Sequence, residues 1–249
     1  MTFDSSDLGK LAVLLDVDGT LLDIAPTPRE VVVPRDLPAT LMRLRDRLDG
    51  ALAIVSGRPI GQIDEFFVPF KFAAIGGHGA EMRPVADGPT ISGKAAPIDR
   101  AFSAKLKHIA SQHPGVLIED KGYSMALHYR LAPNEGIGLI HDVKHAFESA
   151  DDRSYELLSG KAVLEIKRAG FNKGSAVRQL MTYPPFKGRR PVFVGDDVTD
   201  EDAFDVMAEF NGEAISVGRK LLHVKRHFAA PADVRRWVAQ LAEPQAVCP

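Results

Sequence analysis

The sequence predicts an α/β fold in which a parallel sheet, with helices on both faces, is interrupted by a smaller inserted α+β domain. Short apolar runs without polar alternation are typical of strands buried on both faces of such a sheet. Segments with helical spacing of apolar residues lie between these runs, and the middle of the chain turns to Gly and Pro before a different order of elements begins. With 249 residues, 45% of them hydrophobic, the chain is long enough for two modest domains.

The first part of the chain alternates strands with helices. Its apolar runs end abruptly in polar or glycine-rich clusters. Between the first two runs, leucines recur every three or four positions, which indicates an amphipathic helix that Gly50 stops. We therefore expect strands at residues 10–15, 51–55 and 72–75, and helices at residues 36–48 and from Pro59 onward.

From about residue 84 the composition turns to Gly and Pro, which indicates a linker, and the segments after it indicate a small α+β insert. We expect helices there at residues 98–112 and 136–150, and strands at residues 115–118, 124–129, 155–158 and 162–167. The first pattern then returns, with helices at residues 173–181, from Asp200 and at 231–241, and strands at 191–194 and 214–217. These patterns predict a core domain of residues 1–88 and 171–249, and an inserted domain of residues 89–170.

The composition argues against several classes of protein. A formal net charge of -2 does not suggest a polyanionic partner, and the basic residues between positions 219 and 226 lack the interleaved aromatics of nucleic-acid binders. The apolar runs are far shorter than the roughly 20 residues of a membrane span, and the N-terminus lacks the order of a secretory signal. We expect a cytoplasmic protein without nucleic-acid or membrane partners, in which Cys248 forms no internal disulfide. The sequence indicates no particular oligomeric state.

Acidic residues follow the first predicted strand. Asp16 and Asp18 are separated by one residue, so both can face the crevice at the strand ends, where a cation would relieve their repulsion. A turn that ends at Gly19 explains the same pair about equally well.

A second polar cluster, Ser56, Gly57 and Arg58, follows the next predicted strand. Ser56 can cap the helix that comes after it, and the free N–H groups of such a helix start also bind anions, which Gly57 would allow to approach closely. Helix capping does not explain Arg58 as readily.

The third cluster and a lysine complete the candidate site. Asp196 and Asp197 precede a predicted helix, so helix-terminal electrostatics does not explain them, and they indicate metal ligands. Lys173 lies just inside a helix that Asn172 would cap, where a cation is disfavoured by roughly 0.3 to 1 kcal/mol unless a phosphate or carboxylate lies nearby. Together with a carboxylate at a rigid strand end, these residues predict a Mg²⁺-dependent phosphoryl-transfer site.

The motifs resemble those of the haloacid dehalogenase (HAD) superfamily of Mg²⁺-dependent phosphatases in their order and strand-end setting. They occupy residues 16–21 (DVDGTL), 56–58 (SGR), 173–174 (KG) and 195–197 (GDD). Further segments are similar to one branch, the trehalose-6-phosphate phosphatases: residues 78–81 (HGAE), 119–121 (EDK), 128–130 (HYR), 165–167 (EIK) and 195–202 (GDDVTDED). The resemblance covers about residues 10 to 220. It implies a HAD-like Rossmannoid three-layer core with a parallel sheet and an inserted α+β cap domain.

The resemblance also implies a role for each matching residue. Asp16 would attack phosphorus and become an aspartyl phosphate, while Asp18 would protonate the leaving sugar oxygen and later activate water. Mg²⁺ would be held by Asp16, the backbone carbonyl of Asp18 and Asp196, with help from Asp197 or Asp200. The phosphate would be bound by Ser56, Gly57 and Lys173. Sugar hydroxyls would be bound by Glu119, Lys121 and Glu165, with further substrate contacts from Arg58, His78, Glu81, His128 and Arg130.

The expected activity is hydrolysis of trehalose 6-phosphate to trehalose and phosphate, with Mg²⁺ as cofactor. A related capped enzyme acting on sucrose phosphate or mannosylglycerate phosphate is the alternative within the same chemistry. A phospho-acceptor signalling domain would not need the acid Asp18, and a catalytically silent partner of a sugar synthase would not need the complete acidic set. Without the resemblance, an exposed ion pair on a strand would explain Glu119 and Lys121.

Overall fold

The computed structural model describes residues 5–92, 96–148 and 154–244, so Cys248 lies outside the described residues. The chain forms two compact units. We call the first, Met1–Ile24, Val31–Gly93 and Asn172–Pro249, the core unit, and the second, Ala25–Glu30 and Lys94–Phe171, the insert unit. Among the described residues, the helices are too short or too polar to pass through a lipid bilayer.

The core unit contains an eight-stranded sheet. The strands run in the order β12 (Arg226–Phe228), β11 (Glu213–Val217), β10 (Arg190–Gly195), β1 (Leu11–Leu15), β2 (Leu52–Val55), β3 (Ala73–Gly76), β4 (Glu81–Arg83) and β5 (Ile91–Ser92). Pairing is parallel from β12 to β3, and the last two strands join antiparallel. Every residue of β1 and β2 is buried, as their uninterrupted apolar sequences predict.

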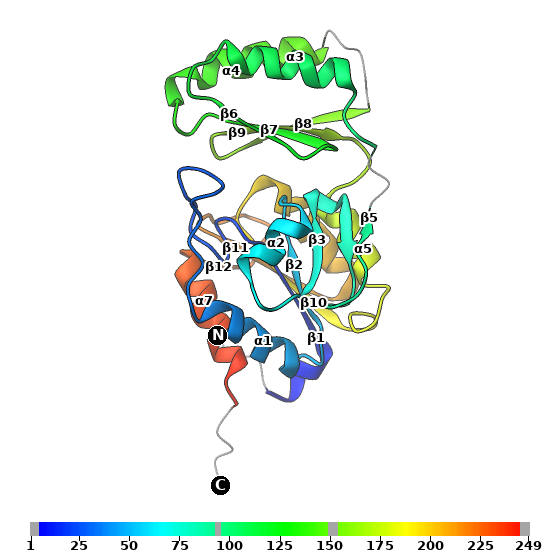
Figure 1. The fold of residues 1–249 in the computed structure, drawn as a ribbon. Helices are drawn as coiled ribbons and strands as arrows, with labels where there is room; N and C mark the ends of the chain where they lie inside the picture. The colour runs from blue at the N-terminus through cyan, green and yellow to red at the C-terminus, as the bar shows by residue number, and fades with distance from the viewer. Residues whose placement is uncertain (1–4, 93–95, 149–153, 245–249) are drawn as a thin grey trace. The chain divides into compact units, whose positions relative to one another are not determined.

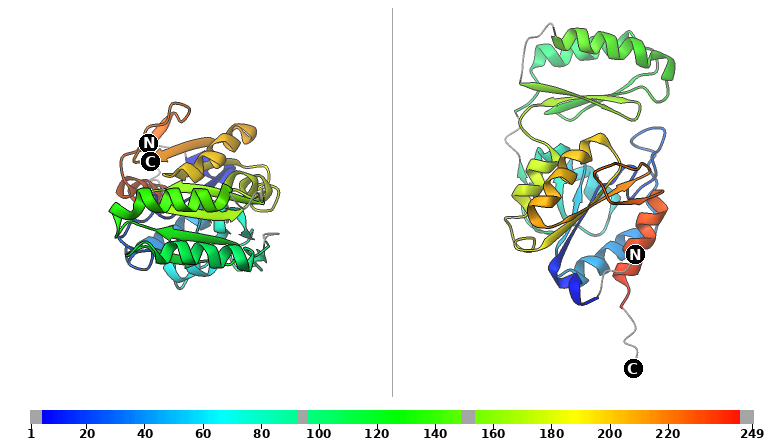
Figure 2. Two further views of the ribbon diagram at one scale, coloured as in Figure 1. Left: turned by 90° about the horizontal axis from the view of Figure 1, so that it is seen from above. Right: turned by 180° about the vertical axis from the view of Figure 1, so that it is seen from behind.

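Helices cover both faces of this sheet, which makes three layers (Figures 1 and 2). On one face lie α1 (Leu37–Arg47), α2 (Ile60–Phe66) and α7 (Pro231–Ala242), and on the other lie α5 (Lys173–Leu180) and α6 (Glu201–Met207). The leucines of α1 at positions 37, 41 and 44 are buried against the sheet. Short 3-10 turns occur at Ser5–Lys10, Gly77–Gly79, Val198–Asp200 and Ala208–Phe210.

The strand order reverses between β1 and β10, which positions the candidate site. From β1 the chain adds β2 and β3 on one side, and later adds β10 and β11 on the other. Connections therefore leave in opposite directions at this point, and in open α/β sheets ligands bind outside the carboxyl ends of the strands at such a point.

The insert unit is a four-stranded antiparallel sheet with two helices on one face (Figure 1). Its strands, in spatial order, are β6 (Leu117–Asp120), β7 (Ser124–His128), β9 (Val163–Arg168) and β8 (Tyr155–Gly160). The helices are α3 (Arg100–Ser111) and α4 (Gly136–Glu148), with a 3-10 turn at Pro133–Glu135 between β7 and α4. Met125 and Ile166 of the sheet pack with Leu106 and Val143 of the helices. Because side chains alternate along a strand, the residues next to Met125 in β7 and next to Ile166 in β9 point to the opposite face of the sheet.

Three details differ from the sequence-based expectations. The glycine- and proline-rich stretch from about residue 84, expected to be a linker, contains β5, and the residues just before it form β4. Both strands extend the core sheet. The edge strand β12, which was not expected, begins at Arg226, the last residue of the basic stretch. In the insert unit, β6 lies two residues later than expected because Gly115 adopts a positive φ of 87° and prolongs the preceding turn.

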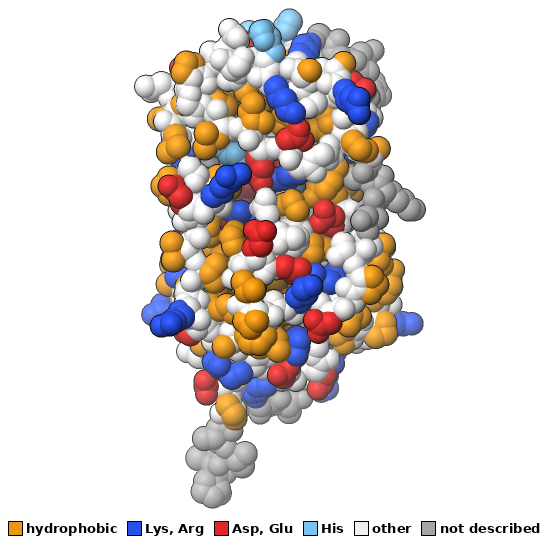
Figure 3. Space-filling view, viewed as in Figure 1, with side chains coloured by type: hydrophobic (Ala, Val, Ile, Leu, Met, Phe, Trp, Pro, Cys, Tyr) orange, Lys and Arg blue, Asp and Glu red, His pale blue; other side chains and the backbone are white. Residues whose placement is uncertain are grey.

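Acidic and basic side chains are interspersed on the face of the molecule drawn in Figure 3. This mixture agrees with the nearly balanced charge of the sequence.

Two glycines in the second position of a helix provide a matched test of the packing. A Cβ at Gly174 of α5 would lie 2.2 Å from the backbone oxygen of Asp202, whereas a Cβ at Gly61 of α2 would meet no atom within 4 Å. We predict that Gly174→Ala lowers the free energy of unfolding by about 1 to 3 kcal/mol and that Gly61→Ala raises it by up to about 1 kcal/mol. Urea unfolding measures both, and equal effects of the two substitutions would contradict the tight α5–α6 contact.

Candidate active site

Asp16 and Asp196 lie side by side at the carboxyl ends of the two central strands. Asp16 directly follows β1, and its backbone N–H donates to the carbonyl of Val194 in β10 at 3.0 Å, which continues the parallel ladder by one residue. Asp196 directly follows Gly195, the last residue of β10. Both side chains are buried, so the sheet fixes two carboxylates at the point where the strand order reverses.

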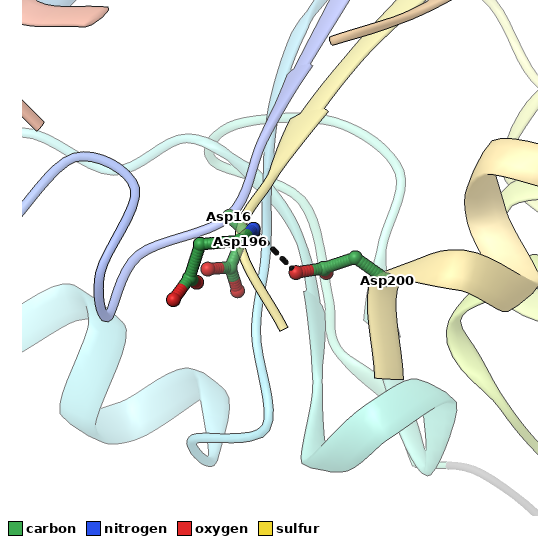
Figure 4. Close-up of side chains that lie close together, drawn as sticks. All are labelled: Asp16, Asp196 and Asp200. Atoms are coloured by element: carbon green, nitrogen blue, oxygen red, sulfur yellow. Dashed lines mark hydrogen bonds between the residues drawn. The ribbon is translucent and has the colours of Figure 1, made fainter. Parts of the chain in front are cut away.

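Asp200 adds a third carboxylate from the turn that precedes α6. One oxygen of this carboxylate accepts hydrogen bonds from the backbone N–H groups of Asp196 and Asp197, each at 2.9 Å. Among the described residues, the side chains of Asp16, Asp196 and Asp200 form a group whose ligand oxygens lie within 4.8 Å of one another (Figure 4). Asp197, expected from the sequence as a possible ligand, contributes its backbone N–H to this loop, and its side chain is not part of the group.

Two glycines make room for these carboxylates. Gly19 has a positive φ of 85°, and a Cβ there would lie 2.2 Å from a carboxylate oxygen of Asp196. A Cβ at Gly195 would lie 2.4 Å from the carboxyl carbon of Asp200. Thr20 then donates a hydrogen bond from its hydroxyl to Asp196 at 3.3 Å. The turn that follows β1 therefore both admits Asp196 and orients it.

Lys173 bonds to two of the three carboxylates. Its buried ammonium donates to Asp16 at 2.8 Å and to Asp200 at 2.6 Å. The sequence predicts an anion beside this lysine, and the structure provides these two carboxylates. Asn172 caps α5 as expected, because its side chain accepts from the N–H of Ser175 at 2.7 Å.

The negative charges of the cluster repel one another, and Lys173 balances only part of this repulsion. Burial raises the pKa of Asp16 well above its usual value, and Asp200 and Asp196 raise it further, although Lys173 opposes them. Burial would lower the pKa of Lys173, but Asp16 and Asp200 outweigh this and raise it, so the lysine stays protonated. Lys173 offsets one of three negative charges. Oxygen ligands with excess negative charge fit a hard divalent cation such as Mg²⁺.

Asp18 points to a different partner. Its two carboxylate oxygens accept hydrogen bonds from the guanidinium of Arg58 at 2.6 and 2.7 Å. The side chain of Gln62 accepts a hydrogen bond from the same guanidinium at 3.3 Å, and the guanidinium carbon lies 4.7 Å from the centre of the Phe66 ring. Arg58, expected as a substrate contact, is therefore bound to Asp18 by two parallel charged hydrogen bonds and stacked on α2.

The residues around the second and third strands have local partners. Ser56 is buried and accepts from the N–H of Arg58 at 3.1 Å, while Glu81 accepts from the N–H of Ile60 at 2.7 Å. Glu81, and not Ser56, thus caps the start of α2. A Cβ at Gly57 would lie 2.4 Å from Nε2 of His78, so it is the imidazole ring that closely approaches this glycine.

The insert unit brings the other predicted residues together on the face of its sheet that α3 and α4 leave uncovered. Glu165 accepts from Lys121 at 3.1 Å and from the hydroxyl of Ser124 at 2.8 Å. A ring nitrogen of His128 lies 3.1 Å from a carboxylate oxygen of Glu119. These four predicted residues form two neighbouring polar pairs. Arg130 instead binds the backbone carbonyls of Ala25 and Lys161 within the same unit.

Sequence reasoning missed three residues that support the site: Thr20, Ser124 and Arg219. Thr20 was visible only as part of the first motif, and Ser124 carries no charge that would single it out. Arg219 was grouped with a basic surface stretch, yet its side chain donates to the backbone carbonyl of Asp196 at 3.0 Å. No local pattern relates it to a residue so distant in the sequence.

A family model described as Trehalose-phosphatase matches residues 14–235 of this chain. The chain is 42% identical over 214 residues to a probable trehalose-phosphate phosphatase of Sinorhizobium fredii (strain NBRC 101917 / NGR234), an alignment that covers 86% of this chain and 80% of that protein. It is 37% identical over 232 residues to the trehalose-6-phosphate phosphatase of Escherichia coli (strain K12), covering 93% and 86% of the two chains.

Solved structures share the fold. The C-terminal domain of Candida albicans trehalose-6-phosphate phosphatase superposes with a TM-score of 0.81 at 24% identity, covering 96% of this chain and 93% of that one. A phosphatase of the haloalkanoate (HAD) enzyme superfamily from Bacteroides thetaiotaomicron gives a TM-score of 0.56 at 17% identity, covering 93% and 94%. At these identities the similarity establishes the fold and says nothing of the substrate.

Repulsion among the crowded carboxylates should favour metal binding and should lower the stability of the metal-free protein. We expect Asp196→Asn to raise the unfolding free energy of the metal-free protein by about 1 kcal/mol, because one of the mutually repelling charges is removed. Mg²⁺ should then raise the melting temperature of the wild type and not that of the variant.

Thermal unfolding in a chelator and in Mg²⁺ tests this expectation. Asp205→Asn, which alters an exposed carboxylate on α6, is the control and should change neither value. A variant Asp196→Asn that is less stable than the wild type in the chelator would contradict the electrostatic account.

Proposed function

This chain belongs to the trehalose-phosphatase family and is a phosphoric monoester hydrolase with the HAD fold, and from this premise we propose that it hydrolyses trehalose 6-phosphate to trehalose and phosphate. One observation carries the proposal. Asp16 is fixed at the end of a central strand, beside Asp196 and bonded to Lys173, where a carboxylate can attack phosphorus while its charge is balanced.

The reaction takes two steps at Asp16. A carboxylate oxygen of Asp16 forms a bond to phosphorus as the bond between phosphorus and the sugar oxygen breaks, and Asp18 gives its proton to that oxygen. Trehalose leaves and an aspartyl phosphate remains. A water molecule then attacks the same phosphorus, Asp18 takes the proton from the water, and inorganic phosphate leaves while the Asp16 carboxylate is restored. Both carboxylate oxygens of Asp18 accept hydrogen bonds from Arg58 in the structure, so the acid step requires that one of these bonds opens and that oxygen carries a proton when the substrate is bound.

Mg²⁺ would be held by the carboxylates of Asp16 and Asp196 and by the backbone carbonyl of Asp18. When bound, it supplies positive charge that offsets the charge of the transferred phosphoryl group. Asp200 would support the metal site without binding Mg²⁺ directly, because its oxygens already accept hydrogen bonds from Lys173 and from the N–H groups of Asp196 and Asp197. Lys173, Ser56 and the main chain at Gly57 would bind the phosphate oxygens.

The insert unit would serve as a cap that recognises the sugar. In this proposal the core domain, residues 1–88 and 171–249, carries out the reaction, and the inserted domain, residues 89–170, binds the sugar. An uncharged disaccharide offers only hydroxyl groups, so a selective surface must present both donors and acceptors. Glu119, Lys121, His128 and Glu165 provide both on one face of the insert sheet. Their mutual hydrogen bonds keep these groups satisfied and oriented when no sugar is bound.

The proposed substrate is a small molecule, and we propose a cytoplasmic enzyme that needs neither nucleic acid nor membrane. A panel of sugar phosphates, including sucrose phosphate and mannosylglycerate phosphate, tests the narrow specificity. Preference for any phosphate other than trehalose 6-phosphate would overturn it.

Replacing the nucleophile should abolish turnover. We predict that Asp16→Asn lowers the rate of phosphate release from trehalose 6-phosphate by at least about 10³-fold, because an amide does not form the acyl phosphate. Asp23→Asn, an exposed carboxylate on the same segment, is the control and should keep full activity. Phosphate release within tenfold of the wild type in Asp16→Asn would contradict the assignment of the nucleophile.

Replacing a sugar-binding carboxylate should separate two activities. We predict that Glu119→Ala lowers kcat/KM for trehalose 6-phosphate by about 10 to 100-fold, the cost of one hydrogen bond to a charged group, and leaves slow hydrolysis of 4-nitrophenyl phosphate nearly unchanged. Asp120→Ala is the matched control, because this neighbouring side chain points to the helix face and pairs with Lys107 at 2.8 Å. Equal loss of both activities in Glu119→Ala would contradict the cap assignment.

A further inference from the structure

Arg219 joins the two ends of the loop that carries two carboxylates of the site. It lies just after β11, where Gly218 adopts a positive φ of 71°. Its Nε donates to the backbone carbonyl of Asp196 at 3.0 Å, and its Nη2 lies 2.9 Å from a carboxylate oxygen of Glu201 at the start of α6. One guanidinium therefore spans the segment between residues 196 and 201.

Asp196 is thereby held at three separate atoms. Its backbone N–H donates to Asp200, its backbone carbonyl accepts from Arg219, and its carboxylate accepts from Thr20. Both polar groups of its main chain are therefore engaged, so the residue has little freedom to rotate about its own backbone. Groups that orient a metal ligand in this way affect the affinity for the metal without touching it.

We propose that Arg219 is a positioning residue of the divalent-cation site, which fixes the main chain of Asp196 so that its carboxylate faces Asp16. This inference rests on the proposed function, because it presumes that the carboxylate cluster binds Mg²⁺. It adds a residue from outside the motifs to the support of that site.

The charge of Arg219 acts in the opposite direction, because a cation near the site repels Mg²⁺. Glu201 neutralises this charge at 2.9 Å, and the arginine side chain is 32% exposed, so solvent screens what remains. The structural effect therefore outweighs the electrostatic one. The two effects predict opposite changes in affinity when Arg219 is removed, which makes them separable by experiment.

The test measures Mg²⁺ binding to the full, metal-free chain by isothermal titration calorimetry, without any substrate. We expect Arg219→Ala to raise the Kd for Mg²⁺ by about 10 to 100-fold, and Arg219→Lys to give an intermediate value, since lysine can donate to one partner. Arg226→Ala is the matched control, because Arg226 belongs to the same basic stretch, pairs with Glu213 at 2.6 Å and lies on β12. It should leave the Kd within about twofold of the wild type.

Thermal unfolding of the metal-free variants separates positioning from general damage. Arg219→Ala and Arg226→Ala should melt within a few degrees of each other in chelator while differing in Mg²⁺ affinity. An unchanged or lower Kd in Arg219→Ala, with Mg²⁺ binding by the wild type intact, would overturn this inference and leave the proposed function standing. A wild type that binds no Mg²⁺ would overturn both.

Discussion

The burial of three carboxylates beside one another at the ends of β1 and β10 is the constraint on which the rest of the site depends. Asp16 and Asp200 accept hydrogen bonds from Lys173, Asp200 also accepts from two main-chain N–H groups, and Asp196 accepts from the hydroxyl of Thr20. Lys173 offsets one of their three charges. Such a cluster is unfavourable in the protein alone, because like charges out of water repel strongly. This repulsion supports the proposal that the cluster binds a cation.

The surrounding structure makes the cluster possible. Parallel strands end at one edge of the sheet, so residues far apart in the sequence come together there without long loops. Glycines at positions 19 and 195 leave the space that the carboxylates occupy, and Gly174 lets α5, which carries Lys173, approach α6 closely. The same sheet positions Arg58 after β2, where it binds Asp18. The insert unit is built separately around its own apolar core, which leaves one face of its sheet available for polar groups.

The sequence predicts much of this arrangement and misses identifiable parts of it. The buried strands of the core were predictable because both faces are covered and the strands are uniformly apolar, and Lys173 was correctly expected to have an anionic partner because a lysine at a helix start is otherwise unfavourable. The strands β4, β5 and β12 were not predicted, since they have two or three residues each and no hydrophobic period. The cap of α2 by Glu81 and the contact of Arg219 with Asp196 join distant segments, and no spacing rule indicates them. Asp200, and not Asp197, joins the cluster because of the turn geometry before α6. The sequence does not distinguish the two residues, because both are aspartates in the segment that precedes this helix.

A crystal structure of the chain with Mg²⁺ and beryllium fluoride, a mimic of an acyl phosphate, tests the central claim most directly. The account predicts beryllium fluoride attached to a carboxylate oxygen of Asp16, with Mg²⁺ about 2.1 Å from oxygens of Asp16 and Asp196. Mg²⁺ bound away from these two carboxylates, or beryllium fluoride attached to another residue, would contradict it.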